Sequence, residues 1–263
     1  MIPRALSIAG SDSGGGAGIQ ADLKTFMALG VYGMSVITSV TAQNTESVLG
    51  IHDIPHEFVE LEVDAVLSDI GADAVKLGML SNERIVSSTA KKLREYGIEK
   101  IVVDPVMISK TGASLLGKDA VGALVRDILP ISYIVMPNLP EAEVITGQSV
   151  SSVDEMKEAA RIIKSLGPEY VLMKGGHLDA PSDALDILYD GREYYEYRAP
   201  RVNTRNTHGT GCTYSAAVCA CLARGASARE AVREAKDYVT GAIKNSLELG
   251  RGHGPLNHFW KYE

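Results

Sequence analysis

Short apolar runs alternate along this chain with longer segments whose apolar residues recur at helical spacing. The short runs have the length of buried strands and cover residues 5–9, 34–40, 73–77, 100–103, 132–136 and 170–173. The longer segments cover residues 19–29, 56–70, 82–96, 154–166, 211–224 and 227–249. This alternation is typical of a parallel sheet covered by helices on both faces. It predicts a single α/β domain over residues 1–263, with a hairpin at 184–197 around Asp190 and Gly191.

Polar and glycine-rich clusters follow most of the predicted strands, and open α/β sheets bind ligands at the carboxyl ends of their strands. The first cluster is the glycine-rich loop 10–18. It does not match a dinucleotide-binding fingerprint, because Ile19 stands where the last glycine is required. The second cluster contains Gln43 and Asn44, whose amides can each donate and accept hydrogen bonds, as reading the edge of a heteroaromatic ring requires. A polar loop that caps the next segment fits the same residues.

Two later strand ends carry groups that suit phosphate or a divalent cation. Asn138 and Glu141 are oxygen donors suited to Mg²⁺, and the same spacing forms a capping box at a helix start. Lys174 precedes two glycines, which fits either a phosphate contact or a solvated lysine. Residues 112–119 match a P-loop except at Asp119, which replaces the hydroxyl that binds Mg²⁺, and no strand leads into them. We therefore reject a P-loop.

Residues 206–217 have the pattern of a glycine-spaced turn that opens directly into a helix of small residues. Gly209 and Gly211 permit a positive φ and a close backbone approach, and the first turn of the helix directs unpaired N–H groups into the turn. The pattern predicts an anion site. Cys212 lies in this first turn, where the positive end of the helix dipole lowers a cysteine pKa. An ordinary tight turn with a buried cysteine is the alternative.

The charge balance is acidic, with 26 Lys and Arg against 33 Asp and Glu, so no global basic field predicts a nucleic-acid or membrane partner. No apolar run reaches the length of a membrane span, and residues 1–4 lead into a strand without the apolar core of a secretory signal. The three cysteines are crowded into residues 212–221, too close in one helix for a disulfide framework. These observations predict a cytoplasmic protein.

Seven motifs, in order along the chain, carry a resemblance to a known family. They are residues 9–22, 41–45, 76–80, 104–107, 137–143, 174–178 and 208–213. In sequence and order they resemble the hydroxymethylpyrimidine/phosphomethylpyrimidine kinases of thiamine biosynthesis, which belong to the ribokinase-like superfamily. The resemblance extends over essentially the whole chain. Because the sequence ends at Glu263, we expect no synthase domain of the kind fused to some relatives.

The resemblance implies a doubly wound, mostly parallel sheet and two successive ATP-dependent phosphorylations of 4-amino-5-hydroxymethyl-2-methylpyrimidine, first on its hydroxyl and then on the monophosphate. It also implies ATP and Mg²⁺ as cofactors, small-molecule substrates and a homodimer. The residues implied around the pyrimidine are Gly10, Ala17, Asp22, Gln43, Met79 and Val106. Those implied to hold metal and phosphates are Asp104, Glu141, Asn138 and Lys174. The implied anion hole and nucleotide contacts are Thr207, Gly209, Thr210, Gly211, Cys212 and, near the base, Lys236.

Catalysis would then involve Lys174, Gly209, Gly211 and Cys212. Ribokinase relatives generally carry an aspartate where this turn has Cys212, so we expect Cys212 either to take the proton of the attacking hydroxyl or only to position that group. We also expect residues 109–117 to close over the phosphates as a lid.

Other activities fit parts of the same pattern. Pyridoxal kinase activity, alone or in addition, and a non-catalytic pyrimidine-binding protein are the alternatives. A thiol hydrolase built on Cys212 and His208 is disfavoured, because two residues so close in one turn do not establish a base and an oxyanion hole.

Overall fold

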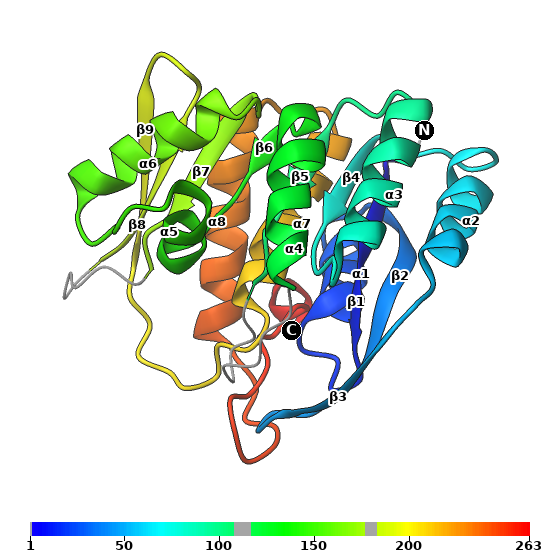
Figure 1. Cartoon of the computed structure of the whole chain (residues 1–263). Helices are drawn as coiled ribbons and strands as arrows, with labels where there is room; N and C mark the ends of the chain where they lie inside the picture. The colour runs from blue at the N-terminus through cyan, green and yellow to red at the C-terminus, as the bar shows by residue number, and fades with distance from the viewer. Residues whose placement is uncertain (1, 108–116, 177–182) are drawn as a thin grey trace.

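The computed structural model describes residues 2–107, 117–176 and 183–263. Its strands are β1 Arg4–Asp12, β2 Tyr32–Gln43, β3 Val48–Asp53, β4 Ala74–Leu77, β5 Ile101–Val103, β6 Ile134–Val135, β7 Tyr170–Lys174, β8 Asp183–Tyr189 and β9 Tyr194–Pro200. Within the described residues they join one sheet in the order β3-β2-β1-β4-β5-β6-β7-β8-β9 (Figure 1).

The centre of the sheet is parallel and both edges are antiparallel. Strands β2, β1, β4, β5, β6 and β7 run parallel to their neighbours. Strand β3 pairs antiparallel with β2, and the predicted hairpin of β8 and β9 continues the other edge from β7. The chain winds outward from β1 in both directions, so the predicted doubly wound α/β fold is confirmed.

Helices cover both faces of the sheet. Their bounds are α1 Gly18–Ala28, α2 His56–Leu67, α3 Glu83–Glu95, α4 Lys118–Ala123, α5 Leu139–Thr146, α6 Val153–Ser165, α7 Thr210–Ala223 and α8 Ala228–Lys244. A π-helical turn follows α4 at Leu124–Ile128, and 3-10 turns lie at Leu129–Ile131 and Trp260–Tyr262. Helices α2 to α6 pack over one face, and α1, α7 and α8 pack over the other (Figure 1).

The alternation of β1 divides its side chains between these two cores. Leu6 and Ile8 belong to the core under α2 and α3, whereas Ala5 belongs to the core under α7 and α8. Helix α7 is rich in small side chains, and Ala216 and Ala220 are fully buried. Because these residues let the helix lie close against the sheet, its N-terminus is held firmly at the carboxyl edge of the parallel strands.

The structure differs from the sequence-based expectations at a few boundaries. Strand β2 continues through Gln43 instead of ending near residue 40, and the unpredicted β3 pairs with its extension, Thr41 opposite Ile51. The last helix ends at Lys244, not near 249, because Leu247 then donates its backbone N–H to Pro255. The expected lid at 109–117 and the rejected P-loop lie largely outside the described residues.

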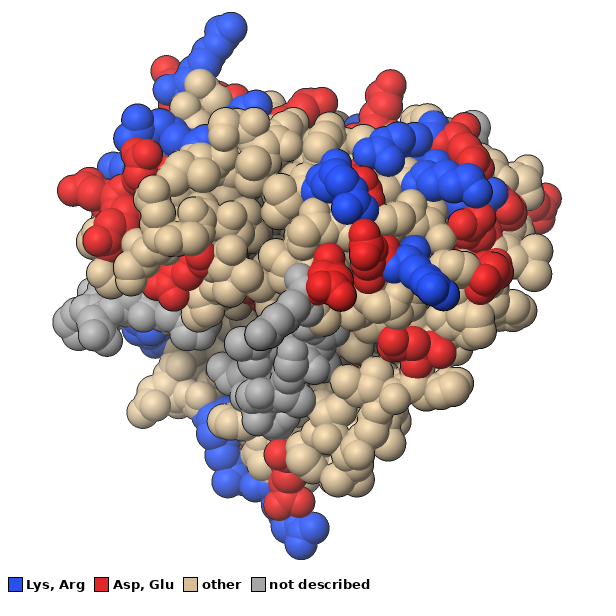
Figure 2. All heavy atoms as spheres, viewed as in Figure 1, with Lys and Arg blue, Asp and Glu red and all other residues tan. Residues whose placement is uncertain are grey.

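On the face seen in Figure 2, acidic and basic side chains are interspersed among the described residues, without a continuous basic patch. Within the part of the chain that the structure describes, no helix has the length and apolar character needed to cross a membrane.

Candidate active site

The carboxyl ends of the parallel strands open into one cavity of about 970 Å³. Fifteen of the sixteen predicted site residues line it: Gly10, Ala17, Gln43, Met79, Asp104, Val106, Asn138, Glu141, Lys174, Thr207, Gly209, Thr210, Gly211, Cys212 and Lys236. Most of them follow strand ends that are far apart in sequence, and the others come from the start of α7 and from α8. A parallel sheet brings such ends to the same edge, which is why one cavity gathers them.

The glycine turn before α7 has the conformation that its sequence predicts. Gly209 is the N-cap of α7 and has φ +82°, in the left-handed region that favours glycine. A side chain at this position would collide with the backbone oxygen of Gly16, so the turn lies directly against the loop 10–18. The N–H groups of Gly211 and Cys212 belong to the first helical turn, which has no acceptors within the helix. Because Gly211 and Cys212 line the cavity, the positive end of the α7 dipole faces it.

A buried charged group lies beside this turn. Lys174, at the end of β7, places its Nζ 2.6 Å from Asp104 Oδ1 and 3.8 Å from Glu141 Oε2. Burial alone would lower the pKa of Lys174, but the two carboxylates outweigh it and raise that pKa, so the ammonium stays charged. Gly211 lies against both Asp104 and Lys174, because an added Cβ would be 3.3 Å from Asp104 Oδ2. The anion turn and the cation therefore face the same space.

Asn138 and Glu141 form the capping box that their spacing allows. Asn138 Oδ1 accepts from the Glu141 backbone N–H at 2.9 Å, and Glu141 Oε2 accepts from the Asn138 backbone N–H at 2.8 Å. Both residues also line the cavity. Burial, with Asp104 nearby, raises the pKa of Glu141 to about 7, although Lys174 opposes the shift. The Glu141 carboxyl thus serves the capping box and also faces the backbone N–H of Met107 and the Lys174 ammonium.

The donor set fits Mg²⁺ held jointly with nucleotide phosphates. Within residues 2–107, 117–176 and 183–263, no cluster of three or more His, Cys, Asp or Glu side chains could hold a metal alone. Asp104 and Glu141 instead supply two carboxylates around Lys174. Mg²⁺ in such kinase sites usually takes one or two carboxylates and completes its shell with water and phosphate oxygens. Asp104 and Glu141 can provide that share.

The environment of Cys212 contradicts one expectation. Burial raises the pKa of Cys212 to about 11, and the nearby Asp22 and Asp104 add to this shift. Lys76 and the Gly18 backbone N–H act in the opposite direction but are outweighed. The prediction that the helix N-terminus lowers this pKa is therefore wrong. Burial destabilises the thiolate more than the helix dipole and the Lys76 ammonium stabilise it. Cys212 is a neutral thiol in the unliganded protein.

Asp22 is not where the resemblance implied. Its side chain is fully buried and does not line the cavity. Its Oδ2 instead accepts from Lys76 Nζ at 2.8 Å and from Ser7 Oγ at 2.6 Å, which makes a buried ion pair. Lys76 does line the cavity. The expected contact between Asp22 and the ring is thus corrected, because the Asp22 carboxylate pairs with Lys76 in the interior and does not line the cavity.

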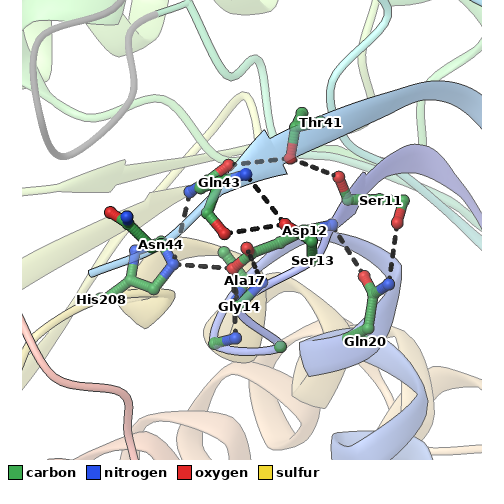
Figure 3. Close-up of polar contacts among 12 residues, drawn as sticks. Ser11, Asp12, Ser13, Gly14, Ala17, Gln20, Thr41, Gln43, Asn44 and His208 are labelled. Carbon is green, nitrogen blue, oxygen red and sulfur yellow. Dashed lines mark hydrogen bonds and ion pairs between the residues drawn. The ribbon is translucent and has the colours of Figure 1, made fainter. Parts of the chain in front are cut away.

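Gln43 belongs to a hydrogen-bonded network at the other end of the cavity (Figure 3). Asp12 Oδ2 is 2.8 Å from His208 Nε2 and also accepts from the backbone N–H of Ala17 at 2.8 Å. Gln43 Oε1 lies 3.2 Å from Thr41 Oγ1. Asp12, Thr41 and His208 all line the cavity.

Lys236 occupies the third part of the cavity. It is buried on α8, and its Nζ lies 2.6 Å from Asp186 Oδ2. Asp186 and Tyr214 line the cavity here together with the apolar Val239 and Ile243. An apolar pocket with one buried ion pair is suited to a flat heterocycle.

Sequence reasoning missed four of these functional groups, namely Asp12, Lys76, Asp186 and His208. Asp12 and His208 stand inside motifs that were recognised, but their partnership joins residues 196 positions apart. Asp186 stands in a strand of the hairpin, where nothing local marks it as a partner of α8. For Lys76, a lysine within a short apolar strand was a usable signal, since a buried lysine needs a partner.

Comparison with known proteins agrees with this geometry. The family model described as phosphomethylpyrimidine kinase matches residues 12–257. The chain belongs to the phosphomethylpyrimidine kinase family. The hydroxymethylpyrimidine/phosphomethylpyrimidine kinase of Bacillus subtilis is 49% identical over 258 residues, which cover 98% of this chain and 95% of that protein. The thiamine biosynthesis bifunctional protein of Geobacter sulfurreducens is 52% identical over 253 residues, and the match spans 96% of this chain but 51% of that protein.

Solved structures of related kinases share the fold. The ADP complex of Bacillus subtilis pyridoxal kinase matches with a TM-score of 0.92 at 38% identity, over 100% of this chain and 99% of that chain. A phosphomethylpyrimidine kinase from Clostridium difficile matches with a TM-score of 0.83 at 47% identity, over 93% of this chain and 100% of that chain. The predicted family resemblance is therefore confirmed, and the structures similar to this chain include a phosphomethylpyrimidine kinase and a pyridoxal kinase.

Proposed function

We propose that this chain phosphorylates 4-amino-5-hydroxymethyl-2-methylpyrimidine with ATP, and then the resulting monophosphate, as a kinase of thiamine biosynthesis. One observation carries the proposal: a single cavity joins an anion turn and a charged Lys174 to an amide that can read a ring edge. A protein that only bound the pyrimidine would not need these phosphate-binding groups. Membership of the phosphomethylpyrimidine kinase family supports the same reaction.

The phosphate end supplies what phosphoryl transfer requires. The transferred group carries charge on its outer oxygens, so catalysis depends on alignment and on neutralising that charge. In our proposal, the N–H groups of Gly209 to Cys212 and the Lys174 ammonium receive this charge. Asp104 and Glu141 would hold Mg²⁺, which would supply positive charge to the phosphates. Asn138, Thr207 and Thr210 would contact the nucleotide phosphates, and Lys236 would lie beside the base.

Cys212 has a restricted role in this mechanism. Because its thiol is neutral, it is suited to hold the attacking hydroxyl by a hydrogen bond and not to begin the reaction as a thiolate. We propose that it positions this hydroxyl against the anion turn. Replacing Cys212 by Ala tests the stronger role: an unchanged turnover number would show that Cys212 is not the base.

The ring end carries the recognition of the pyrimidine. In our proposal, Gln43 pairs with the exocyclic amine and the adjacent ring nitrogen, while Gly10, Ala17, Met79 and Val106 enclose the ring. The variant Gln43→Glu replaces an amide donor by a second acceptor, so it should raise the Michaelis constant for the pyrimidine more than it lowers turnover. Equal effects on both constants would count against this pairing.

The decisive experiment measures ADP release from ATP and Mg²⁺ with three acceptors in parallel: the hydroxymethylpyrimidine, its monophosphate and pyridoxal. We expect turnover with both pyrimidines and much less with pyridoxal. The same assay without Mg²⁺ tests the metal requirement. Pyridoxal as the preferred acceptor would replace the substrate assignment, and binding of the pyrimidine without any ADP release would support the binding-protein alternative.

Pyridoxal kinase activity is the second candidate. The observation that favours it is the match to the ADP complex of Bacillus subtilis pyridoxal kinase over the full length of this chain. Pyridoxal also carries a hydroxymethyl group on a six-membered nitrogen heterocycle, so the phosphate end would serve both substrates.

We further propose that the chain is one kinase domain, that it forms a homodimer and that it works in the cytoplasm. The single sheet that joins the described strands supports one domain. Leu49 and Ile51 are exposed on the edge strand β3, which supports pairing with a second copy. The three free cysteines fit a reducing compartment. Light scattering coupled to size-exclusion chromatography would measure the assembly, and a monomer would contradict the dimer.

A further inference from the structure

The backbone of Gln43 is held in place by hydrogen bonds, but its side-chain amide can adopt two orientations. Its backbone is fixed, because Ser13 Oγ accepts from the Gln43 N–H at 2.8 Å and donates to the Gln43 carbonyl at 2.7 Å. The amide itself lies between two polar atoms (Figure 3). Its Oε1 is 3.2 Å from Thr41 Oγ1 and its Nε2 is 3.5 Å from His208 Nε2. A half-turn about the last side-chain bond exchanges oxygen and nitrogen in the same space.

Thr41 offers the amide an acceptor. The hydroxyl of Thr41 has one hydrogen, and its nearest acceptor is the backbone oxygen of Ser11 at 2.8 Å. The lone pairs of Thr41 Oγ1 are then left to face the amide. An N–H group is their proper partner, whereas a carbonyl oxygen would oppose one acceptor to another.

His208 offers the amide a donor. Asp12 accepts from His208 Nε2 at 2.8 Å and also from the backbone N–H groups of Gly14, Gly16 and Ala17. These donors hold Asp12 as a carboxylate, which can only accept, so His208 Nε2 must carry the hydrogen. An Nε2–H that donates to Asp12 cannot accept from the Gln43 amide. Its proper partner is the amide oxygen, as the second acceptor of a shared hydrogen bond.

We propose that Thr41 and His208 are positioning residues that hold the Gln43 amide with its nitrogen toward Thr41 and its oxygen toward His208. Both mismatched contacts become hydrogen bonds in this orientation. The inner edge of the amide then presents a donor on the Thr41 side of the cavity and an acceptor on the His208 side. Because Asp12 fixes the donor on His208, the order of donor and acceptor is set by the hydrogen-bond partners of Gln43.

This order selects a class of ligand and fixes its direction, and this step rests on the proposed function. A 4-aminopyrimidine presents an amine donor next to a ring-nitrogen acceptor. It pairs with the amide when the amine lies on the His208 side and the ring nitrogen on the Thr41 side. A 4-oxopyrimidine has the same shape but presents a carbonyl acceptor beside a ring N–H donor. In the same position, its carbonyl would face the amide oxygen and its N–H would face the amide N–H, so we expect it to bind poorly.

A crystal structure of the full chain with 4-amino-5-hydroxymethyl-2-methylpyrimidine tests the direction. The exocyclic amine is visible outside the ring, so its position reports the amide orientation without distinguishing nitrogen from oxygen in the protein. We expect the amine on the His208 side of Gln43. An amine on the Thr41 side would overturn the inference.

Binding measurements test the positioning role. Calorimetry would give the ratio of dissociation constants for the 4-oxo and 4-amino compounds, which we expect to be about 10- to 100-fold in favour of the amine in the wild-type protein. Thr41→Val keeps the shape but removes the acceptor, so the ratio should fall to about threefold or less. Thr41→Ser keeps the hydroxyl and should retain the wild-type ratio within about twofold. Because each ratio compares two ligands on one variant, a change in folding stability does not alter it.

The possible outcomes separate this inference from the proposed function. A wild-type protein that phosphorylates the aminopyrimidine but binds both compounds alike would overturn the inference and leave the kinase function standing. An unchanged ratio in Thr41→Val would overturn the role of Thr41. A protein that neither binds nor phosphorylates the aminopyrimidine would overturn both.

Discussion

At one end of the cavity, three charged side chains lie close together, whereas at the other end neutral and charged hydrogen-bonding groups surround a single side-chain amide. Lys174, Asp104 and Glu141 form the first region, in which one ammonium lies beside two carboxyl groups. Asp12, Thr41 and His208 form the second region, around the Gln43 amide. The comparison teaches that transfer of a charged group needs a strong local field, while discrimination between neutral rings needs fixed directions.

The largest expected effect comes from removing the cation of the first region. Lys174→Met should lower the turnover number about 10²- to 10³-fold, the usual cost of losing one group that stabilises transition-state charge. ADP release at saturating substrates would measure it. Lys236→Met is the matched control, because this second buried lysine also lines the cavity and pairs with Asp186. If Lys236 lies beside the base as we propose, the variant should mainly raise the Michaelis constant for ATP. A turnover number for Lys174→Met within threefold of wild type would show that Lys174 does not stabilise the transferred charge.

The second effect breaks the contact between the glycine turn before α7 and the loop 10–18. Gly209→Ala forces a left-handed residue to carry a side chain that meets the Gly16 backbone oxygen, so we expect a loss of about 2–4 kcal/mol in unfolding free energy, together with most of the activity. Gly30→Ala is the control, since Gly30 has φ +72° and no atom within 4 Å of an added Cβ. It should lose only about 1–2 kcal/mol. Equal losses in denaturant titrations would show that the loop contact is unimportant.

The third effect is the pH dependence of stability that arises in the charged region. Burial raises the pKa of Glu141 to about 7 from 4.5, so between these values the unfolded carboxyl ionises while the folded one keeps its proton. Stability must then fall as pH rises through this window. Relative to Glu141→Gln, which does not titrate, metal-free wild type should lose about 1–3 kcal/mol between pH 4.5 and 7.5. Denaturant titrations across the window would measure it, and a constant difference would refute the raised pKa.

The smallest effect concerns the thiol between the two regions. Because the pKa of Cys212 is raised to about 11, its alkylation by iodoacetamide should keep increasing about tenfold per pH unit from pH 7 to 10. Mass spectrometry of the labelled peptide would follow the rate. A plateau below pH 8 would indicate a thiolate and would restore the base role. Cys212→Ser should retain turnover within about tenfold, since a hydroxyl can hold the substrate as a thiol does.

Much of this architecture could be predicted from local sequence, because strand runs and glycine turns are local signals. The turn at Gly209 needs a positive φ that glycine supplies, and the helix after it needs small residues to lie against the sheet. Strand β3 was missed because its side chains are mostly exposed and show no alternation. An edge strand that is held mainly by backbone pairing with its neighbour has little apolar pattern of its own.

What could not be predicted depends on burial and on partners distant in sequence. The dipole argument for Cys212 used only its place in a helix, whereas its pKa is decided by how many protein atoms surround the sulfur. The family resemblance implies that the motif around Asp22 binds the ligand. The Asp22 carboxylate instead pairs in the interior with Lys76, which is 54 positions away in sequence. Pairing of this kind becomes visible only when the sheet order is known.

The contact of the loop 10–18 with the turn around Gly209 also bears on how the molecule is made. The two segments are far apart in sequence, with Asp12 and His208 separated by 196 positions, so the site has a high contact order even though each half is a simple local turn. During synthesis the glycine-rich loop emerges early and must wait for α7 and for the segment that bonds His208 through Gly254. A nascent chain therefore cannot bind its ligands until it is almost complete. Ligands that bind only the finished site would stabilise the last step of folding and none of the earlier ones.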